Sequence, residues 1–546
     1  MGRTKNEIID ESTDAYIKGL NPANLPPPET MAAELTKLVE QNIVLENALR
    51  GKGKGFRIPE TLCFDQIAQL MVVRYRIIRV PCTGSNVDTD YDLLAIYVPE
   101  GPEEGTYSTS DEVFYKLARR FNRRITSKVF EEVLKVLRAI VPRVTRCMDR
   151  DLIAVNNGIF NYRTKKLHPF TPDLVFTVKS HVNYNDKATN IVIHNDDDGT
   201  DWDVESWIAE LSDDPDIVDL IWQILGAIIR PHVRWNKSAW FYSEEGNNGK
   251  GTLCELMRSL CGEAAFACIP LCDFSKDFAL EPLTRYTAII VDENNVGIYI
   301  DKVANLKAVI TNDVIPIDRK FKTPISYQFY GFMVQCLNEF PRIRDKSDSF
   351  YRRQLFIPFE KCFTGRERKY IKEDYLHRKE VLEYVLFRVL SMNYYELSEP
   401  ERYREVLDEY KEFNDPVRQF FKEMVSQFVW DILPFSFLYE LYKAWLRKNN
   451  PGGIIQGKNK FITELVSVVR ASTIWYCKDK KKQIRSQGRM ERPEPLIIEY
   501  GLEDWKDPDY HGDNPNRIAH PKLKVIYRGL VRVSTADMGP GGPAAA

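Results

Sequence analysis

The fold is decided by the stretch Trp240-Phe241-Tyr242-Ser243-Glu244-Glu245-Gly246-Asn247-Asn248-Gly249-Lys250-Gly251-Thr252. A short apolar strand runs into a glycine-rich turn that ends in lysine, and the following residues 253–260 have the pattern of a helix. Glycines let backbone N–H groups turn inward around a polyphosphate, a helix N-terminus adds positive potential, and a lysine can reach the β and γ phosphates. The stretch therefore predicts a phosphate-binding loop made of Gly246, Asn247, Asn248, Gly249, Lys250, Gly251 and Thr252.

The loop departs at two positions from the usual pattern Gly-x-x-x-x-Gly-Lys-Ser/Thr. Glu244 stands where the first glycine is expected, and Gly251 stands where the hydroxyl residue is expected, so that Thr252 follows one position late. A Gly-x-x-Gly-Lys segment alone also occurs in ordinary surface turns. The strand before it and the helix after it favour nucleotide binding, because the mechanism requires that context.

A second apolar run, Thr287-Ala288-Ile289-Ile290-Val291, ends in Asp292 and Glu293. Such a run is typical of a strand buried on both faces, whose carboxyl end meets the ligand in α/β folds. An aspartate there can hold Mg²⁺ through water, and a neighbouring glutamate can polarise the attacking water. Because it follows a phosphate loop, the run predicts an ATPase that uses ATP and Mg²⁺, with Asp292 at the metal and Glu293 as a catalytic group.

Two further candidate catalytic positions follow along the chain. The apolar run 330–337 ends in Asn338, an amide that can orient water or contact the γ-phosphate, although asparagine at a strand end is also a routine turn residue. Arg352 and Arg353 precede the apolar run 354–359. An arginine offered across a subunit boundary can neutralise the charge on a transferred phosphate, and surface salt bridging is the competing explanation.

Between these runs lies a predicted hairpin, in which residues 314–318 pair with residues 325–329. Cations and one aromatic residue occupy its tip: Arg319, Lys320, Phe321 and Lys322. Such a tip suits contact with the backbone of single-stranded nucleic acid. An ordinary charged hairpin is the alternative, and the spacing alone does not decide between them.

The order of these motifs resembles that of the superfamily 3 helicases of viruses, phages and plasmids, specifically the poxvirus D5-like and phage or plasmid primase-helicase group. The resemblance covers roughly residues 65–360 and includes Asn338-x-x-Pro341 and Ile357-Pro358-Phe359. The segment Ile317-Asp318-Arg319-Lys320 is similar to the DNA-contacting hairpin of the papillomavirus replicative helicase. Asn312 replaces a glycine of the family, which is tolerable because asparagine accepts left-handed backbone angles.

The resemblance implies an α/β fold with an AAA+ P-loop ATPase core, an α+β N-terminal module and a C-terminal winged-helix-like domain. It implies a homo-hexamer that binds ATP between subunits and pulls single-stranded DNA through a central pore to unwind forked DNA. By position, Lys250 binds phosphate, Asp292 holds Mg²⁺, Glu293 activates water and Asn338 senses the γ-phosphate. The family arginine finger corresponds best to Arg353, with Arg352 in reserve, and Lys320 and Lys322 correspond to the DNA-gripping positions. Because Gly251 replaces the usual Ser or Thr, Thr252 is the candidate hydroxyl ligand of the metal.

Two other functions remain open. One is an ATPase that binds nucleic acid as a loader or remodeller without unwinding it. The other is a small nucleotide kinase, since Gly249-Lys250-Gly251-Thr252 also occurs in adenylate-kinase-like loops. Asn338 and the arginine pair argue against the kinase.

The chain is long enough for several domains. An amphipathic helix is predicted over 29–50, a hairpin around Asn157-Gly158, and helices over 435–447 and 458–470. We expect an N-terminal arm and helix (1–55), a D5-like N-terminal module (56–195), a helical collar (196–235), the helicase core (236–365), a helical connection (366–430), a winged-helix-like DNA-binding domain (431–535) and a disordered tail (536–546). Too few residues precede the module for a primase fold, so a separate primase or polymerase is an expected partner.

Composition narrows the remaining possibilities. The 546 residues include 76 Lys and Arg against 78 Asp and Glu, which excludes a uniformly basic coat but allows a local basic groove. The sequence has neither an apolar run long enough to span a membrane nor the apolar core of a signal peptide, so we expect a soluble, cytoplasmic protein with no membrane partner.

Two groups of residues invite a metal-site interpretation that the sequence does not favour. Cys268 and Cys272 lie close together among ten cysteines, but no second Cys/His pair follows at zinc spacing, so we expect small buried residues of a reduced protein. Asp88, Asp90 and Asp92 alternate beside a glycine and a serine, which is more typical of a solvated loop than of a polymerase metal site.

Overall fold

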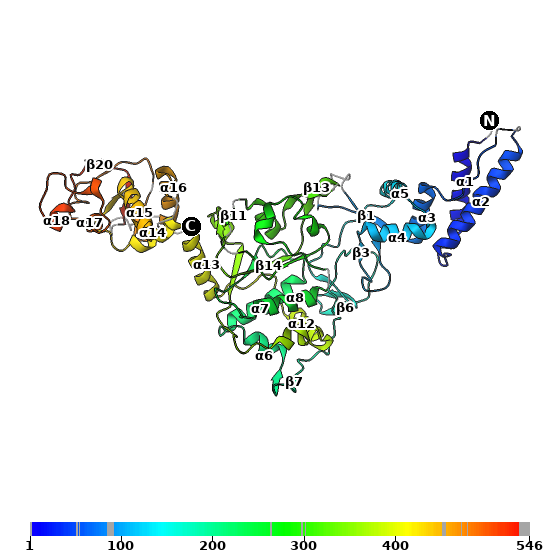
Figure 1. Ribbon diagram of the computed structural model, residues 1–546, viewed down its shortest axis with the longest axis horizontal. Coiled ribbons are helices and arrows are strands. Elements are labelled where there is room, and N and C mark those ends of the chain that lie inside the picture. Colours follow the sequence, from blue (N-terminus) through cyan, green and yellow to red (C-terminus); the bar gives the residue numbers. More distant parts are fainter. Residues whose placement is uncertain are drawn as a thin grey trace. The chain divides into compact units, whose positions relative to one another are not determined.

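The computed structural model describes residues 3–50, 53, 55–83, 92–262, 265–295, 297, 299–300, 302–320, 322–449, 455–470, 472–477 and 479–533, with residues 299 and 322 described by backbone alone. The chain divides into two units, Met1–Arg404 and Glu405–Ala546, coloured by sequence in Figure 1. No helix among these residues has the length and apolar character needed to cross a membrane.

The first unit begins with helices around one apolar core. They are α1 (Lys5–Gly19), α2 (Pro28–Ala48), α3 (Phe64–Arg74), α4 (Asp111–Phe121) and α5 (Ser127–Ile140), beside the antiparallel strands β1 (Ile77–Val80), β2 (Leu93–Tyr97) and β3 (Tyr107–Ser108). The amphipathic helix predicted over 29–50 is confirmed as α2, which buries Leu35, Val39 and Ile43 in this core. Its apolar stripe therefore packs within its own unit.

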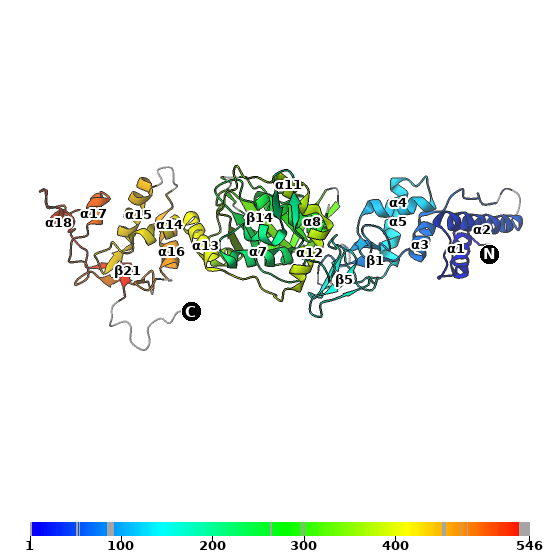
Figure 2. The ribbon, with the colours of Figure 1, turned by 90° about the horizontal axis from the view of Figure 1, so that it is seen from below.

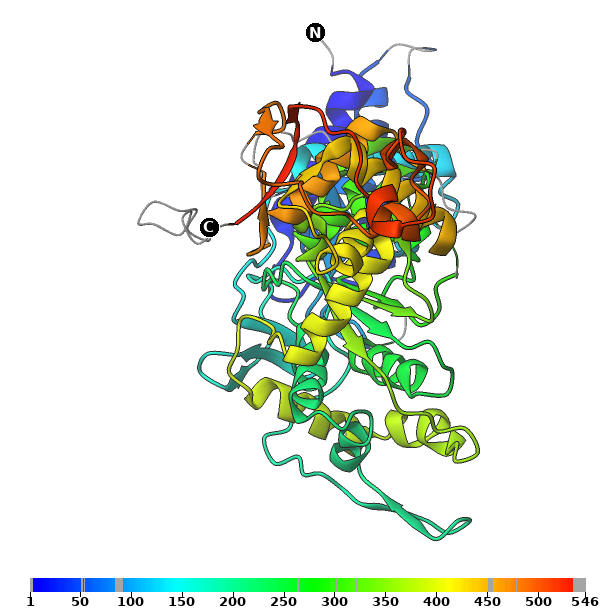
Figure 3. The same cartoon turned by 90° about the vertical axis from the view of Figure 1, so that its left-hand side faces the viewer.

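A second set of strands leads toward the central sheet. It consists of β4 (Leu152–Val155), β5 (Gly158–Asn161) and β6 (Lys166–His168), followed by the ribbon of β7 (Ile193–Asn195) and β8 (Thr200–Trp202), which projects from the rest of its unit in Figure 3. The predicted Asn-Gly hairpin is confirmed as β4–β5. Gly158 has a φ of 153°, and a Cβ there would lie 2.3 Å from the carbonyl oxygen of His168, so the turn requires glycine.

The centre of the first unit is an entirely parallel sheet, which confirms the α/β class. Its strands lie in the order β10-β14-β9-β16, with β9 at Ser238–Tyr242, β10 at Ala288–Val291, β14 at Phe332–Leu337 and β16 at Gln354–Pro358. All residues of β10, β14 and β16 are buried, as their continuous apolar runs predict. Ala267 extends the sheet beyond β10 through a parallel bridge to Ile289.

Helices cover the sheet and fix its connections. Helix α7 (Pro215–Ile228) packs on β14, α8 (Lys250–Cys261) packs on β10, and α12 (Lys379–Ser391) packs on α7 and α8, an arrangement that Figure 2 shows around β14. The smaller elements around the sheet are α6 (Val204–Ala209), β11 (Tyr299–Ile300), α9 (Ala304–Ile310), β12 (Val314–Arg319), β13 (Lys322–Gln328), β15 (Arg342–Ile343), α10 (Asp348–Tyr351) and α11 (Lys369–Glu373). The chain leaves β9 through α8 and returns at β10, two places away in the sheet, so β9 lies at a topological switch point, where α/β sheets bind ligands.

Helix α13 (Glu401–Asn414) contains the boundary between the units, which falls within the predicted helical connection 366–430. The second unit has the helices α14 (Pro416–Met424), α15 (Phe435–Asn449), α16 (Lys458–Val469), α17 (Leu496–Glu499) and α18 (Pro515–Ile518), with the strands β17 (Ile432–Pro434), β18 (Trp475–Tyr476), β19 (Ile484–Arg485), β20 (Ile526–Tyr527) and β21 (Gly529–Arg532). The two predicted helices are confirmed as α15 and α16. The core of the second unit contains buried aromatic residues, including Trp430, Trp445 and Trp475.

Candidate nucleotide site at the carboxyl edge of the sheet

The predicted phosphate loop connects β9 to α8 at the carboxyl edge of the parallel sheet. The helix begins at Lys250, three residues before the predicted start, so Gly251 and Thr252 belong to its first turn. Gly249 has a φ of 86°, and a Cβ there would lie 2.6 Å from Leu211 Cδ2. Glycine is therefore needed where the chain turns into the helix.

Lys250 is the best-anchored side chain of the loop. Its Nζ donates hydrogen bonds to the carbonyl oxygens of Ser243 and Leu337, each at 3.3 Å, and to Oδ1 of Asn338 at 2.9 Å. The side chain is buried, and burial lowers the pKa of Lys250 to about 8. The structure thus joins two predicted site residues that are 88 positions apart in the sequence.

The two asparagines of the loop shape its backbone. Asn247 has a φ of 54°, and its Nδ2 donates to Thr364 Oγ1 and Glu367 Oε1, both at 3.2 Å. Asn248 Nδ2 donates to the carbonyl oxygen of Glu245 at 2.5 Å. Both side-chain amide groups therefore hold the loop in place.

A segment after β16, residues 360–367, supports the loop from outside. The N–H of Phe363 donates to the carbonyl oxygen of Asn247 at 2.7 Å, in addition to the side-chain contacts from Thr364 and Glu367. Sequence reasoning missed this segment, because its composition is that of an ordinary polar connection. By contrast, a Cβ at Gly246 or Gly251 would meet no atom within 4 Å, so the space beside these glycines is open.

The acids after β10 differ in their surroundings. Both are exposed, but Asp292 Oδ2 forms an ion pair with Arg258 Nη2 of α8 at 3.0 Å. The next residue, Asn294, is buried and donates through Nδ2 to Gln335 Oε1 at 2.9 Å. Neither Arg258 nor Asn294 was predicted, since no local pattern separates them from a surface arginine and a turn asparagine.

These residues include oxygen donors of the kind that Mg²⁺ prefers. Asp292 supplies a half-exposed carboxylate, and Thr252 supplies a hydroxyl in the first turn of α8. Mg²⁺ is usually held by one or two carboxylates together with waters and substrate phosphates, so this donor set fits a metal that arrives with a nucleotide. Among the residues described, no cluster of three or more His, Cys, Asp and Glu side chains could hold a metal by itself.

The arginine pair follows α10. Arg352 is exposed, whereas Arg353 is partly buried and donates through Nη1 to Ser349, both to its carbonyl oxygen and to its Oγ. Burial and the neighbouring charge of Arg352 lower the pKa of Arg353. In the part of the chain that the structure describes, neither arginine forms a hydrogen bond or ion pair with Lys250 or Asn338.

The predicted hairpin is confirmed as β12–β13, with Ile317 opposite Ile325. Arg319 folds back on the turn and donates to the carbonyl oxygen of Thr323 through Nε at 3.1 Å and Nη2 at 2.8 Å. The backbone N–H of Lys320 lies 3.4 Å from Glu281 Oε2. Phe321 lies outside the described residues, and Lys322 is described by its backbone alone.

Two smaller predictions have clear outcomes. Asn312 has a φ of 54°, which confirms the left-handed backbone expected where the family has glycine. The solvated-loop prediction is wrong for Asp92, which is buried and accepts two hydrogen bonds from Arg143, at 2.7 and 3.0 Å. Asp88 and Asp90 lie outside the described residues.

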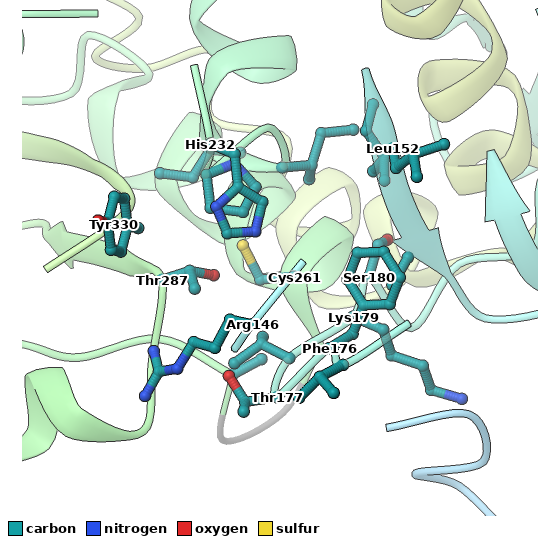
Figure 4. Close-up of a pocket in the computed structure, with 18 residues that line it drawn as sticks. Arg146, Leu152, Phe176, Thr177, Lys179, Ser180, His232, Cys261, Thr287 and Tyr330 are labelled. Carbon is teal, nitrogen blue, oxygen red and sulfur yellow. The ribbon is translucent and has the colours of Figure 1, made fainter. Parts of the chain in front are cut away.

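A cavity of about 40 Å³ lies elsewhere in the first unit, lined by parts of residues 146–180 and 228–330. Figure 4 shows the His232 ring and the Cys261 thiol directed toward its interior. Burial and the charge of Arg146 lower the pKa of His232 to about 4, so the imidazole is neutral. None of the predicted site residues lines this cavity.

Three family models match parts of the chain. The model described as D5 N terminal like matches residues 111–213, and the model described as Poxvirus D5 protein-like matches residues 412–505. The chain is similar to D5-like proteins. Between these matches, a family of unknown function (DUF5906) matches residues 241–353, a range that contains Lys250, Asp292 and Asn338. The D5-like similarity thus flanks the segment that carries the candidate site.

Among solved structures, two forms of the NrS-1 C-terminal region are similar to this chain. One has 13% identity and a TM-score of 0.40, and the other has 14% identity and a TM-score of 0.42; each match covers 86% of this chain and 99% of the other. No curated protein matches this chain.

Proposed function

We propose that this chain is an ATP-dependent replicative DNA helicase of superfamily 3 that acts in the replication of a phage, virus or plasmid. The observation that supports this best is the alignment of three strand ends. In the order β10-β14-β9, neighbouring parallel strands end at Asp292 and Glu293, at Asn338, and at the loop containing Lys250. A nucleotide at this edge would therefore meet acid, amide and ammonium groups together.

The chain's own groups have separate tasks in this proposal. Lys250 is held by two carbonyl oxygens and Asn338, so its ammonium already faces acceptors that the β and γ phosphates would replace or join. Glu293 is exposed, so its carboxylate is accessible to a water molecule that it would polarise. When bound, Mg²⁺ would neutralise charge on the phosphates, with Asp292 and Thr252 as its protein ligands.

The AAA+ core and the hexamer complete the proposal. Arg353, or Arg352 as the exposed alternative, would reach the nucleotide of a neighbouring subunit and neutralise charge in the transition state. Ser349 holds the Arg353 guanidinium in a defined direction, which suits an arginine that would contact the nucleotide of a neighbouring subunit. An arginine that completes a site on another copy would make ATP hydrolysis depend on assembly.

DNA contacts are proposed for two regions. At the tip of β12–β13, Arg319, Lys320, Phe321 and Lys322 would contact the backbone of the translocating strand. In the second unit, α15 and α16 with β18 and β21 would act as a winged-helix-like domain for duplex DNA. A separate primase or polymerase would supply priming.

The test uses the full chain, a forked DNA and a single-stranded DNA. Wild type is expected to hydrolyse ATP faster with single-stranded DNA and to displace a strand from the fork, and Lys250→Ala is expected to lose both. Stimulated hydrolysis without strand displacement would instead support a loader or remodeller. Hydrolysis that DNA does not stimulate, or a monomer by mass measurement with ATP and forked DNA, would contradict the proposed helicase.

A further inference from the structure

Arg258 links the phosphate-loop helix to the acid after β10. Its Nη2 lies 3.0 Å from Asp292 Oδ2, and its Nη1 lies 3.3 Å from Glu255 Oε2, one turn earlier in α8. Its guanidinium carbon lies 5.6 Å from the centre of the Phe266 ring. The side chain of Arg258 is 17% exposed, against 40% for Asp292, so the arginine is the more fixed partner.

The Glu255 end of this link is itself held. Glu255 Oε1 lies 3.8 Å from His377 Nε2, and the other ring nitrogen of His377 lies 3.1 Å from Ser259 Oγ. One face of α8 thus carries a chain of contacts from His377 through Glu255 and Arg258 to Asp292. A planar guanidinium held at one end in this way sets the direction of the carboxylate at its other end.

The ion pair with Arg258 involves only one of the two carboxylate oxygens of Asp292. Arg258 takes Oδ2, and Oδ1 has no hydrogen-bond partner among the residues that the structure describes. Carboxylates that bind metal ions are commonly oriented by an outer partner, here the ion pair with Arg258, and loss of such a partner typically weakens metal affinity or activity by about 10- to 100-fold. The free oxygen is therefore the one available to a metal ion or to its bound water.

We infer that Arg258 is a positioning residue that holds Asp292 Oδ2 so that Oδ1 faces the Mg²⁺ of a bound nucleotide. This inference rests on the proposed ATP site. It assigns to Arg258 an effect on the metal and not on the binding of the nucleotide itself. In a competing role, Arg258 would block Asp292, and the metal would have to break the ion pair before it binds. Removal of the arginine would then make the metal bind more tightly.

The test compares two binding measurements on the full chain. Binding of Mn²⁺ in the presence of ATP is followed by the electron paramagnetic resonance signal of the free ion, and binding of ATP in EDTA is followed by calorimetry. One variant is Arg258→Gln. The other is Glu255→Gln, which keeps the arginine but removes the negative charge of its partner. Arg285→Gln is the matched control, because Arg285 is an exposed arginine of the same unit.

Arg258→Gln is expected to weaken Mn²⁺ binding by about 10- to 100-fold and to leave ATP binding in EDTA unchanged. Glu255→Gln is expected to weaken Mn²⁺ binding to a smaller extent, and Arg285→Gln to leave both values unchanged. Mn²⁺ binding that is equal or tighter in Arg258→Gln would overturn the inference while leaving the ATP site intact. Wild type that binds no ATP in either condition would overturn the proposed function as well.

Discussion

Two lysines of the first unit have the same lowered pKa but contact different groups. Lys250, at the phosphate loop, and Lys165, in the turn between β5 and β6, each have a pKa lowered to about 8 by burial. Each Nζ also donates to two backbone carbonyl oxygens, those of Ser243 and Leu337 for Lys250. By these measures alone, the two positions would be equal candidates for a functional site.

The surroundings of Lys165 explain its state without a ligand. Its Nζ donates to the carbonyl oxygens of Leu390 and Met392, at 2.6 and 2.7 Å, and lies 3.5 Å from the centre of the Tyr162 ring. Arg230 stacks on the same ring, and its charge lowers the pKa of Lys165 further. Lys165 thus ties the end of α12 to the β5–β6 turn, and its contacts are those of a structural crosslink.

Lys250 differs because its third partner, Asn338, is exposed and lies at the end of a neighbouring parallel strand. In the same loop, a Cβ added at Gly246 or Gly251 would meet no atom within 4 Å. A lowered lysine pKa therefore reports burial, whereas convergence of strand ends on an open space indicates a ligand site.

The largest difference is expected in ATP hydrolysis. Lys250→Ala should lower the DNA-stimulated rate by about 10³-fold, the scale of losing one preorganised donor to the phosphates. Lys165→Ala should leave the rate unchanged but lower the free energy of unfolding by about 1–3 kcal/mol, because two partly buried carbonyl groups lose their donor. Steady-state hydrolysis and denaturant unfolding measure the two effects, and a comparable loss of hydrolysis in both variants would remove the distinction.

Asn338 has no counterpart at Lys165, whose Nζ donates only to backbone carbonyl oxygens among the described residues. Asn338→Ala should lower the turnover number by about 10²-fold, the scale expected when a reacting group is misplaced by about 1 Å. Asn338→Asp keeps the shape and the acceptor for Lys250 but loses the amide donor and adds negative charge, so it should be at least as slow. Normal turnover of the Asp variant would show that Asn338 only holds the lysine.

The smallest effect is a pH dependence of stability. The pKa of Lys165 is lowered from 10.5 to about 8 in the folded protein, so the unfolded chain binds more protons between these values. The unfolding free energy contributed by this group therefore rises as the pH increases from about 8 to 10.5. Lys165→Met should flatten that rise relative to wild type in denaturant titrations at several pH values. An unchanged slope would mean that the pKa of Lys165 is not lowered in the folded protein.

The sequence was sufficient for those parts of the site that depend on local patterns. Strand, glycine turn and lysine occur within one short stretch, and the apolar runs before Asp292 and Asn338 predicted buried parallel strands that the structure contains. Hairpin β12–β13 was predictable for the same reason, since alternating apolar residues flank a charged turn.

The remaining parts depend on contacts between distant residues. Asn247 was expected at the phosphates, yet its side chain contacts Thr364 and Glu367, more than 100 positions away. The pairing of Arg258 with Asp292 likewise requires α8 and β10 to be packed together. Such contacts follow from the way that helices pack on the sheet, and no spacing in the sequence encodes them.

The most direct test of the ATP site is calorimetric titration of ATP with Mg²⁺ into the full chain, Lys250→Ala and Lys165→Ala. The two alanine variants remove the same charge from lysines whose pKa is lowered to the same extent. Wild type and Lys165→Ala should bind ATP with equal affinity, and Lys250→Ala should show no detectable binding. Binding by Lys250→Ala as tight as that of wild type would contradict a triphosphate site at this loop.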